Sequence, residues 1–172
     1  MKTMILFGST YGYTQECATK LAKDLGGEVL LVNNAKDKIP SLDDYDTILI
    51  GGSIYMGQIQ KKIKEYCISN KEVLKNKNLG FFISSGIPEN FDANIKNAFP
   101  ESLLKSALSI ENFGGELRTE KMKVTHKLLT AMMKKATAKE NKPPTEPLPE
   151  NIAKMAKTIL QMVVPTCNTV TP

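Results

Sequence analysis

Three short apolar runs, each followed by a loop of small residues, are the feature of the sequence that most restricts its fold. The runs occupy residues 4–7, 46–50 and 79–83, and glycine or serine follows each of them. Continuous apolar runs of this length are typical of strands that are buried on both faces of a parallel sheet. Helical patterns lie between the runs, and this alternation predicts an open parallel α/β sheet.

The segments between these runs contain apolar residues at helical spacing. A helix is expected from about Tyr13 to Leu25, with Thr14 as its N-cap and two glycines after it as a stop signal. Pro100 interrupts a later helical pattern, so that region is expected to hold one helix or two short ones. The remaining expected elements are strands at 28–32 and 108–117, helices at 59–67 and 92–108, and a last helix at 152–163.

A basic, methionine-rich segment separates the fifth expected strand from the last helix. Residues 118–138 have a helical pattern with lysines around an apolar stripe, and a proline-rich connector follows. We interpret 118–149 as an insertion before the last helix of a single domain that spans 1–164. Residues 165–172 have the composition of a frayed tail.

The chain has neither a membrane-spanning stretch nor a secretory signal pattern. No stretch approaches the roughly 20 consecutive apolar residues that a spanning helix needs, and an apolar strand begins almost at the N-terminus. The three cysteines are widely spaced and form no CxxC pair, which argues against a disulfide framework and a zinc site. We therefore expect a cytoplasmic protein. Contact of residues 118–138 with an anionic membrane surface is a further expectation, although a core stripe with a solvated basic face explains the same pattern.

The first loop has the composition of a phosphate-binding turn. It consists of Ser9, Thr10, Tyr11, Gly12, Tyr13 and Thr14. Hydroxyl groups, successive backbone N–H groups and the positive end of a helix dipole would converge there on one anion. A tight strand-to-helix connection without a ligand explains the same residues, so this loop alone leaves both interpretations open.

Other kinds of phosphate chemistry are disfavoured because their side chains are missing. The loop has neither the glycine and lysine spacing of a P-loop nor the GxGxxG spacing of a dinucleotide site. A receiver domain needs an acidic residue after the third strand, where this chain has Gly51 and Gly52. A small tyrosine phosphatase needs a nucleophilic cysteine and an arginine, whereas this loop starts with Ser9 and contains no arginine. A phosphate held by hydroxyl and N–H groups alone suits a permanently bound monophosphate.

The sequence resembles the flavodoxin family, whose first strand is followed by the pattern S-x-x-G-x-T, matched here by residues 9–14. The resemblance implies a three-layer sandwich with a five-stranded parallel sheet in the order 2-1-3-4-5 and helices on both faces. It also implies that the first loop holds the phosphate of FMN, while the loops after the third and fourth strands flank the isoalloxazine ring. By position, the second loop is Ser53, Ile54, Tyr55, Met56 and Gly57, and the third is Ser84, Ser85 and Gly86.

A narrower resemblance is to the flavodoxin-like, menaquinone-dependent protoporphyrinogen dehydrogenases. That group has the pattern G-[AG]-S-I-x-x-G after the third strand, which residues 51–57 match. The basic, methionine-rich stretch KLLTAMMKKA at 127–136 is similar to a segment of the same group. The loop SSGIPENF at 84–91 departs from the group, because a longer basic segment is expected there.

Two functions are consistent with these features. The first is an FMN-dependent oxidoreductase of the protoporphyrinogen dehydrogenase or quinone-linked type, acting on a small anionic or quinone-like substrate. The second is a flavodoxin-type electron-transfer protein that meets a redox partner and turns over no small molecule. The formal net charge of +5 disfavours the second, because flavodoxins of that kind are usually acidic. A scaffold without a cofactor is a third class, and nucleic-acid binding is disfavoured because no aromatic platform accompanies the positive charge.

No catalytic side chain is expected, because a flavin performs the electron chemistry itself. Tyr55 is a candidate to cover one face of the ring, since aromatic stacking is favourable. Gly57 is expected to adopt a positive φ, or to let its backbone approach the ring. The apolar residues that could form a substrate platform are Tyr11, Tyr55, Met56 and Phe91.

Overall fold

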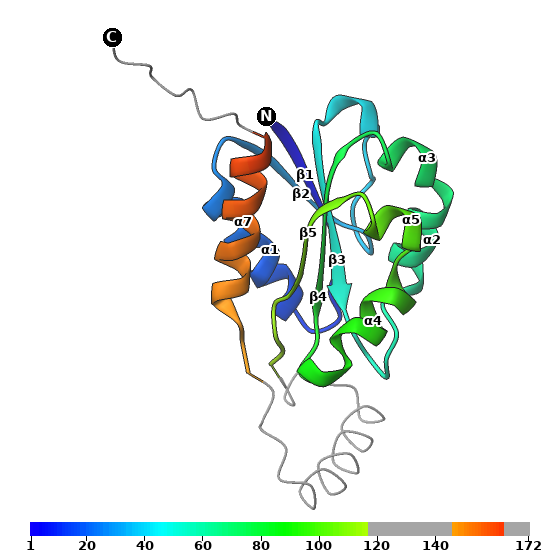
Figure 1. Cartoon of the computed structure of the whole chain (residues 1–172), viewed down its shortest axis with the longest axis vertical. Coiled ribbons are helices and arrows are strands. Elements are labelled where there is room, and N and C mark those ends of the chain that lie inside the picture. The colour runs from blue at the N-terminus through cyan, green and yellow to red at the C-terminus, as the bar shows by residue number, and fades with distance from the viewer. Residues whose placement is uncertain (117–145, 164–172) are drawn as a thin grey trace, which may run out of the picture.

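Strands and helices alternate along the chain from its N-terminus onward (Figure 1). The structure, a computed structural model, describes residues 1–116 and 146–163. The strands are β1 (Lys2–Gly8), β2 (Glu28–Asn33), β3 (Thr47–Ser53), β4 (Asn78–Ser84) and β5 (Ala107–Asn112). The helices are α1 (Tyr13–Leu25), α2 (Lys61–Ser69), α3 (Lys71–Leu74), α4 (Phe91–Ala98), α5 (Glu101–Leu104) and α7 (Pro149–Val163), with 3-10 turns η1 (Leu42–Asp44) and η2 (Pro88–Asn90).

The five strands form one parallel sheet in the order β2-β1-β3-β4-β5, which confirms the expected topology. The chain moves outward from β1 to β2 and then returns past β1 to β3, so the strand order reverses between β1 and β3. Ligands in such sheets bind beyond the carboxyl ends of the strands at this switch point. The register brings those ends together, since Gly8 lies opposite Gly52 and Ser53 lies opposite Ser84.

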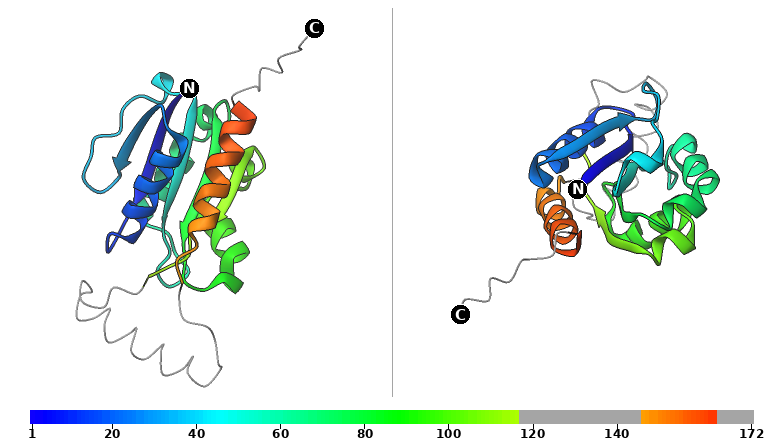
Figure 2. Two further views of the ribbon diagram at one scale, coloured as in Figure 1. Left: turned by 90° about the vertical axis from the view of Figure 1, so that its left-hand side faces the viewer. Right: turned by 90° about the horizontal axis from the view of Figure 1, so that it is seen from above.

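Helices cover both faces of the sheet (Figure 2). α1 and α7 lie on one face, where they pack over Ile5, Leu49 and Phe82. The other face carries α2 to α5 over a second core cluster, to which the neighbouring residues Leu6 and Ile50 belong. Successive side chains of a strand point to opposite faces, so a strand buried on both faces is apolar at every position. This explains the continuous apolar runs of the sequence.

The largest difference from the expected boundaries is at β5, which ends at Asn112, whereas the expected strand continued to 117. The chain turns at Gly114, whose φ is 75°, and this ends the strand early. β3 and β4 instead run further into the small-residue loops than the apolar pattern indicates, to Ser53 and Ser84. Pro100 separates α4 from α5, so the region holds two short helices. Glycines and serines can continue a strand ladder because pairing uses the backbone, and an apolar pattern does not report this.

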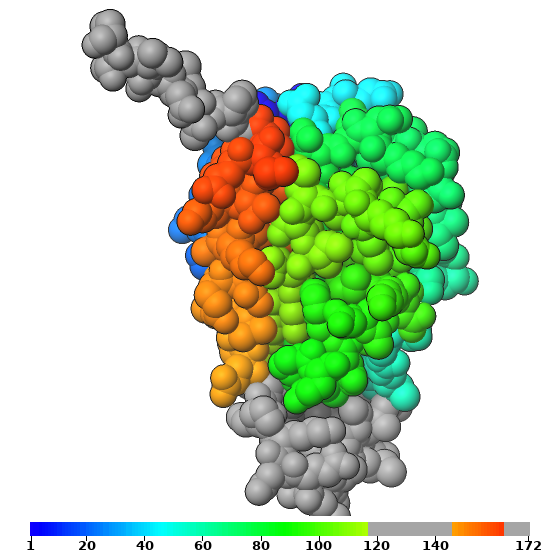
Figure 3. Space-filling view, viewed as in Figure 1, coloured from blue at the N-terminus to red at the C-terminus, as the bar shows by residue number. Residues whose placement is uncertain are grey.

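The segment before α7 pairs with the segment after β5. The Gly115 N–H donates to the Glu146 carbonyl (3.0 Å), and the Leu148 N–H donates to the Phe113 carbonyl (3.1 Å). α7 itself begins at Pro149, earlier than expected, and packs against α1 and β5 (Figure 3). The expected helix at 118–138 and the expected tail at 165–172 lie outside the described residues.

Within residues 1–116 and 146–163, no helix is long and apolar enough to cross a membrane. Cys17 and Cys67 are both buried, and they form no disulfide bond with each other. They belong to the cores on opposite faces of the sheet.

The buried thiol of Cys67 makes the stability of the fold sensitive to alkaline pH. Burial raises the pKa of Cys67 from 9.0 to about 12, because the thiolate would lose its hydration in the core. The contribution of the protonated thiol is complete below pH 9.0 and is lost as the pH rises toward about 12, since the unfolded chain releases its proton first. We expect the free energy of unfolding in urea to fall between about pH 8 and about pH 10.5, and to fall less in Cys67→Ala.

Burial also raises the pKa of Tyr66 to about 12, so a smaller decline is expected to persist in the Cys67→Ala variant. Identical pH dependence of unfolding in the two proteins would contradict the assignment to Cys67.

Candidate cofactor-binding site

Gly12 connects the first loop to α1. Its φ of 94° is left-handed, a conformation that favours glycine, and it occupies the N-cap position without any side-chain cap. Its N–H donates to Ser9 Oγ at 3.1 Å. The prediction of Thr14 as N-cap was wrong, because the left-handed turn at Gly12 lets the helix begin at Tyr13. The first N–H groups of a helix lack intrahelical acceptors, and this end of α1 is therefore suited to an anion.

Thr14 contributes a buried hydroxyl to the first turn of α1. The residue is only 1% exposed, and its Oγ1 has no hydrogen-bond partner among the described residues. A buried hydroxyl without a partner is unfavourable. A phosphate oxygen at the N-terminus of α1 would accept its proton, so this orphaned group fits the predicted phosphate.

Tyr13 braces the first loop against the segment after β5. Its hydroxyl donates to the Phe113 carbonyl at 2.7 Å. Burial raises the pKa of Tyr13 well above its usual value, with the neighbouring Cys17 adding to the shift. The phenol therefore stays protonated and able to donate. Tyr13, one of the predicted site residues, is thus hydrogen-bonded to a residue outside the first loop.

The second loop contains a tight turn at Tyr55–Gln58. The two end residues exchange backbone hydrogen bonds of 2.9 and 3.0 Å, and Met56 and Gly57 have φ values of 50° and 73°. Two consecutive positive φ values define a type I′ turn. The expected positive φ at Gly57 is confirmed. Met56 was not expected to share it, and it is the only non-glycine residue with a positive φ in the described part of the chain.

The two residues at the tip of this turn differ in their surroundings. The Met56 side chain is 66% exposed, so it projects from the loop toward solvent. The Gly57 carbonyl accepts a hydrogen bond from Asn97 Nδ2 in α4 (3.3 Å). At the start of the loop, the Ile54 N–H donates to the Ser84 carbonyl (2.9 Å), which ties the second loop to the third.

The third loop is held by a buried asparagine from the next strand. Asn112 Oδ1 accepts from the N–H groups of Ser85 and Gly114, both at 3.1 Å, and its Nδ2 donates to the Ser85 carbonyl at 3.1 Å. Asn94 Nδ2 in α4 donates to Ser85 Oγ at 3.4 Å. The backbone and the hydroxyl of Ser85 are thus both hydrogen-bonded to asparagine side chains. These side chains come from outside the third loop and fix its conformation.

Close backbone packing continues at Gly86. A Cβ atom on Gly115 would lie 2.8 Å from the Gly86 nitrogen, so only glycine fits there without a shift. Ser84 adds another buried hydroxyl, since its Oγ has no hydrogen-bond partner among the described residues. The third loop therefore packs directly against the segment that leads out of the sheet after β5.

A side chain that the sequence reasoning missed joins the first loop to the second. Gln60 Nε2 donates to Thr10 Oγ1 (3.2 Å) and to Ser53 Oγ, and the two hydroxyl oxygens lie 3.2 Å apart. The side chains that hold the loops are distant in sequence from the residues they contact. The separations are seven residues or more for Gln60, Asn94 and Asn112. No local sequence pattern marks such contacts.

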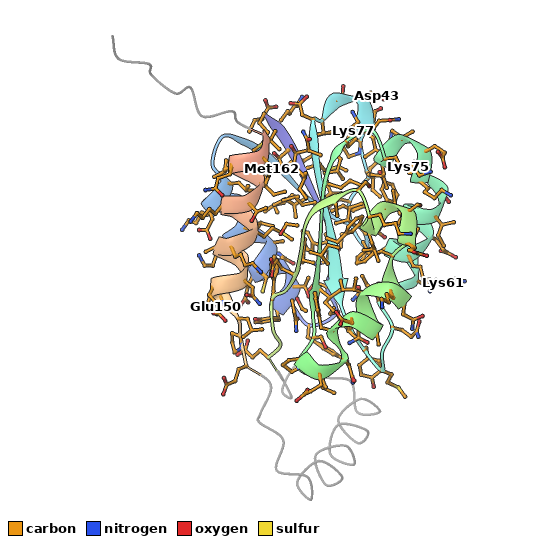
Figure 4. The ribbon with its side chains drawn as sticks, in the orientation of Figure 1. Asp43, Lys61, Lys75, Lys77, Glu150 and Met162 are labelled. Carbon is orange, nitrogen blue, oxygen red and sulfur yellow. The ribbon has the colours of Figure 1, made fainter. Side chains whose placement is uncertain are left out.

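The three predicted loops thus meet at the carboxyl edge of the sheet. Figure 4 shows Glu150 at the end of α7 that faces this edge, while Asp43, Lys77 and Met162 lie toward the opposite edge. Hydroxyl, amide and backbone groups line the loops, a donor set that can bind a phosphate ester and the polar edge of a ring. Tyr11 and Tyr55 are both partly buried and in contact with other groups.

Comparison with known proteins shows which family this fold belongs to. The family model of the flavodoxin domain matches residues 4–143. Protoporphyrinogen IX dehydrogenase [quinone] of Escherichia coli K12 is 36% identical over 69 residues, which cover 38% of this chain and 38% of that protein. The matched part is thus well under half of the length of this relative.

Two solved structures share the fold. A flavodoxin from Streptococcus pneumonia TIGR4 has a TM-score of 0.57 at 14% identity and covers 95% of this chain and 100% of that one. A flavoprotein from Lactobacillus acidophilus NCFM, solved in complex with FMN, has a TM-score of 0.50 at 21% identity and covers 64% and 92%. These similarities agree with the strand order and the helical layers. Because the family model covers most of the sequence, the chain belongs to the flavodoxin-domain family.

Proposed function

We propose that this chain is a flavoprotein that binds FMN in the three loops at the carboxyl edge of the sheet. The observation that carries the proposal is the buried Thr14 hydroxyl at the N-terminus of α1, which has no hydrogen-bond partner among the described residues. The first loop, residues 9–14, binds the phosphate through hydroxyl and N–H groups. Residues 53–57 and 84–86 hold the ring. FMN, when bound, supplies the electron and hydride chemistry.

The other residues of the site position the loops. Asn112 holds the backbone of Ser85, and Asn97 holds the Gly57 carbonyl. Tyr13 fixes the first loop to the segment after β5. A site that is held in place before binding loses less entropy when the cofactor arrives. These contacts therefore support a tightly held cofactor.

The reaction that we propose is oxidation or reduction of a small anionic or quinone-like substrate, as in the quinone-linked protoporphyrinogen dehydrogenases. The local similarity to the Escherichia coli enzyme and the net charge of +5 support this class. A flavodoxin-type electron-transfer protein is the second candidate, supported by the similarity to a flavodoxin over nearly the whole fold. Its partner would be a redox protein.

The described residues that flank the segment 117–145 lie beside the third loop. Gly115 packs on Gly86, and the two flanking stretches are joined by backbone hydrogen bonds. We therefore propose that the lysines of residues 118–138 meet an anionic substrate or an anionic membrane surface near the cofactor. Co-sedimentation with vesicles that contain anionic lipid, compared with a Lys134→Gln/Lys135→Gln variant, tests the membrane contact. Equal binding by both proteins would contradict it.

The visible spectrum of the purified chain tests the cofactor. We expect flavin absorbance after incubation with FMN, and a colourless protein would favour a scaffold without a cofactor. After anaerobic reduction, rapid reoxidation by a quinone or consumption of protoporphyrinogen is the expected result for the oxidoreductase. Electron exchange with a flavoprotein reductase, without turnover of either small molecule, would instead favour the electron-transfer protein.

A further inference from the structure

Gln60 lies where the second loop enters α2, and its carboxamide links the first loop to the second. Its Nε2 is 3.2 Å from Thr10 Oγ1 and also donates to Ser53 Oγ. The two hydroxyl oxygens are themselves 3.2 Å apart. Three side chains from three segments thus close a polar triangle above the ends of β1 and β3.

Two glycines lie directly beneath the carboxamide of Gln60. Gly8 and Gly52 are opposite each other in the register of β1 and β3. A Cβ atom on Gly8 would lie 2.6 Å from Gln60 Oε1, and one on Gly52 would lie 2.3 Å from it. The carboxamide therefore rests on bare backbone. Its Oε1 is buried and has no hydrogen-bond partner among the described residues.

The direction of the hydrogen bonds follows from the donors that are present. Both hydroxyl oxygens accept from the Gln60 amide, so each hydroxyl keeps its own proton. One of these two protons forms the bond between Thr10 and Ser53. The other remains able to donate to an acceptor from outside the protein. One hydroxyl of the Thr10–Ser53 pair can therefore donate a hydrogen bond to a ligand beside the first loop.

We propose that Gln60 is a positioning residue, which fixes the first loop relative to the second and keeps one hydroxyl proton of the Thr10–Ser53 pair available for the phosphate-bearing end of FMN. This inference rests on the proposed binding of FMN. The phosphate end is the acceptor of choice because Thr10 belongs to the loop that leads into the N-terminus of α1. A phosphate oxygen accepts charge-assisted hydrogen bonds, which are stronger than neutral ones.

The dissociation constants of FMN and riboflavin, measured by quenching of flavin fluorescence, test this role because only FMN carries the phosphate. In Gln60→Glu the carboxylate accepts both hydroxyl protons and adds a negative charge. We expect it to weaken FMN binding about tenfold and riboflavin binding less than about threefold. Gln60→Met keeps the length of the side chain without donors or charge, and we expect a loss of about threefold for FMN alone. Gln161→Glu makes the same chemical change on the exposed surface of α7 and is expected to leave both constants unchanged.

Unchanged FMN binding in Gln60→Glu, or equal weakening of FMN and riboflavin, would overturn the inference, because a purely structural role affects both ligands alike. If Gln60→Glu fails to fold, as judged by circular dichroism, Gln60→Met tests the same role. The comparison is again between its loss of affinity for FMN and its loss of affinity for riboflavin. Failure of the unchanged chain to bind FMN is a different outcome. It would refute the proposed function and this inference together.

Discussion

Replacement of Thr14 by valine is expected to weaken FMN binding roughly 10- to 100-fold, while the cofactor-free protein becomes more stable. Valine has nearly the same shape as threonine, so the change removes the buried hydroxyl without leaving a cavity. In the free protein that hydroxyl has no partner among the described residues, and its loss relieves an unfavourable burial. In the complex the same change removes a donor to the phosphate. Fluorescence titration with FMN and urea unfolding of the cofactor-free protein measure the two effects.

Thr47→Val is the matched control for this prediction. Thr47 is fully buried and its Oγ1 also has no partner among the described residues, but it lies at the amino end of β3, at the opposite edge of the sheet. We expect a similar gain in stability with no change in FMN affinity. If Thr14→Val bound FMN as tightly as the unchanged chain, the hydroxyl would not be a phosphate ligand.

Substitution of Gly51 by alanine is expected to lower the free energy of unfolding by about 3 kcal/mol. Gly51 lies opposite Phe82 in the central strands, and the ring covers the bare backbone of the glycine. A Cβ atom at this position would lie 2.4 Å from two ring carbons of Phe82. The ring is fully buried and stacks on Phe113 with centroids 4.6 Å apart, so it has no open direction in which to move. Urea unfolding measures the loss.

A double-mutant cycle with Phe82→Leu separates the steric clash from other effects. Leucine is smaller than phenylalanine and leaves room for the added methyl group. We therefore expect the double variant to be more stable than the sum of the two single changes predicts, by about 1–2 kcal/mol. Additive losses would mean that the ring does not determine the cost at Gly51.

The architecture was predictable because its signals are local. A central parallel strand is buried on both faces, and this produces an apolar run such as residues 79–83 without reference to any other part of the chain. A helix on one face of the sheet produces the spacing seen in Tyr13–Leu25. The loops were predictable for the same reason, because each directly follows its strand.

The details at the loop ends depended on backbone conformations that composition does not specify. Thr14 is a good N-cap residue, yet Gly12 takes that position, two residues earlier, because a left-handed turn at Gly12 leads the chain into α1. Met56 adopts a positive φ because the turn at Tyr55–Gln58 requires it, although methionine does not favour this conformation. In both cases the geometry of the whole loop prevailed over the preference of one residue.

By itself, the sequence determined the parallel α/β class and the three loops in which the candidate site lies, since burial and chain direction leave a pattern in consecutive residues. Only the tertiary structure decided which groups hold those loops. Asn112 reaches the Ser85 peptide across 27 positions, and Gln60 reaches Thr10 across 50. The physical reason is that a hydrogen bond depends on the positions of two groups in space, and folding brings together groups whose separation along the chain carries no signal.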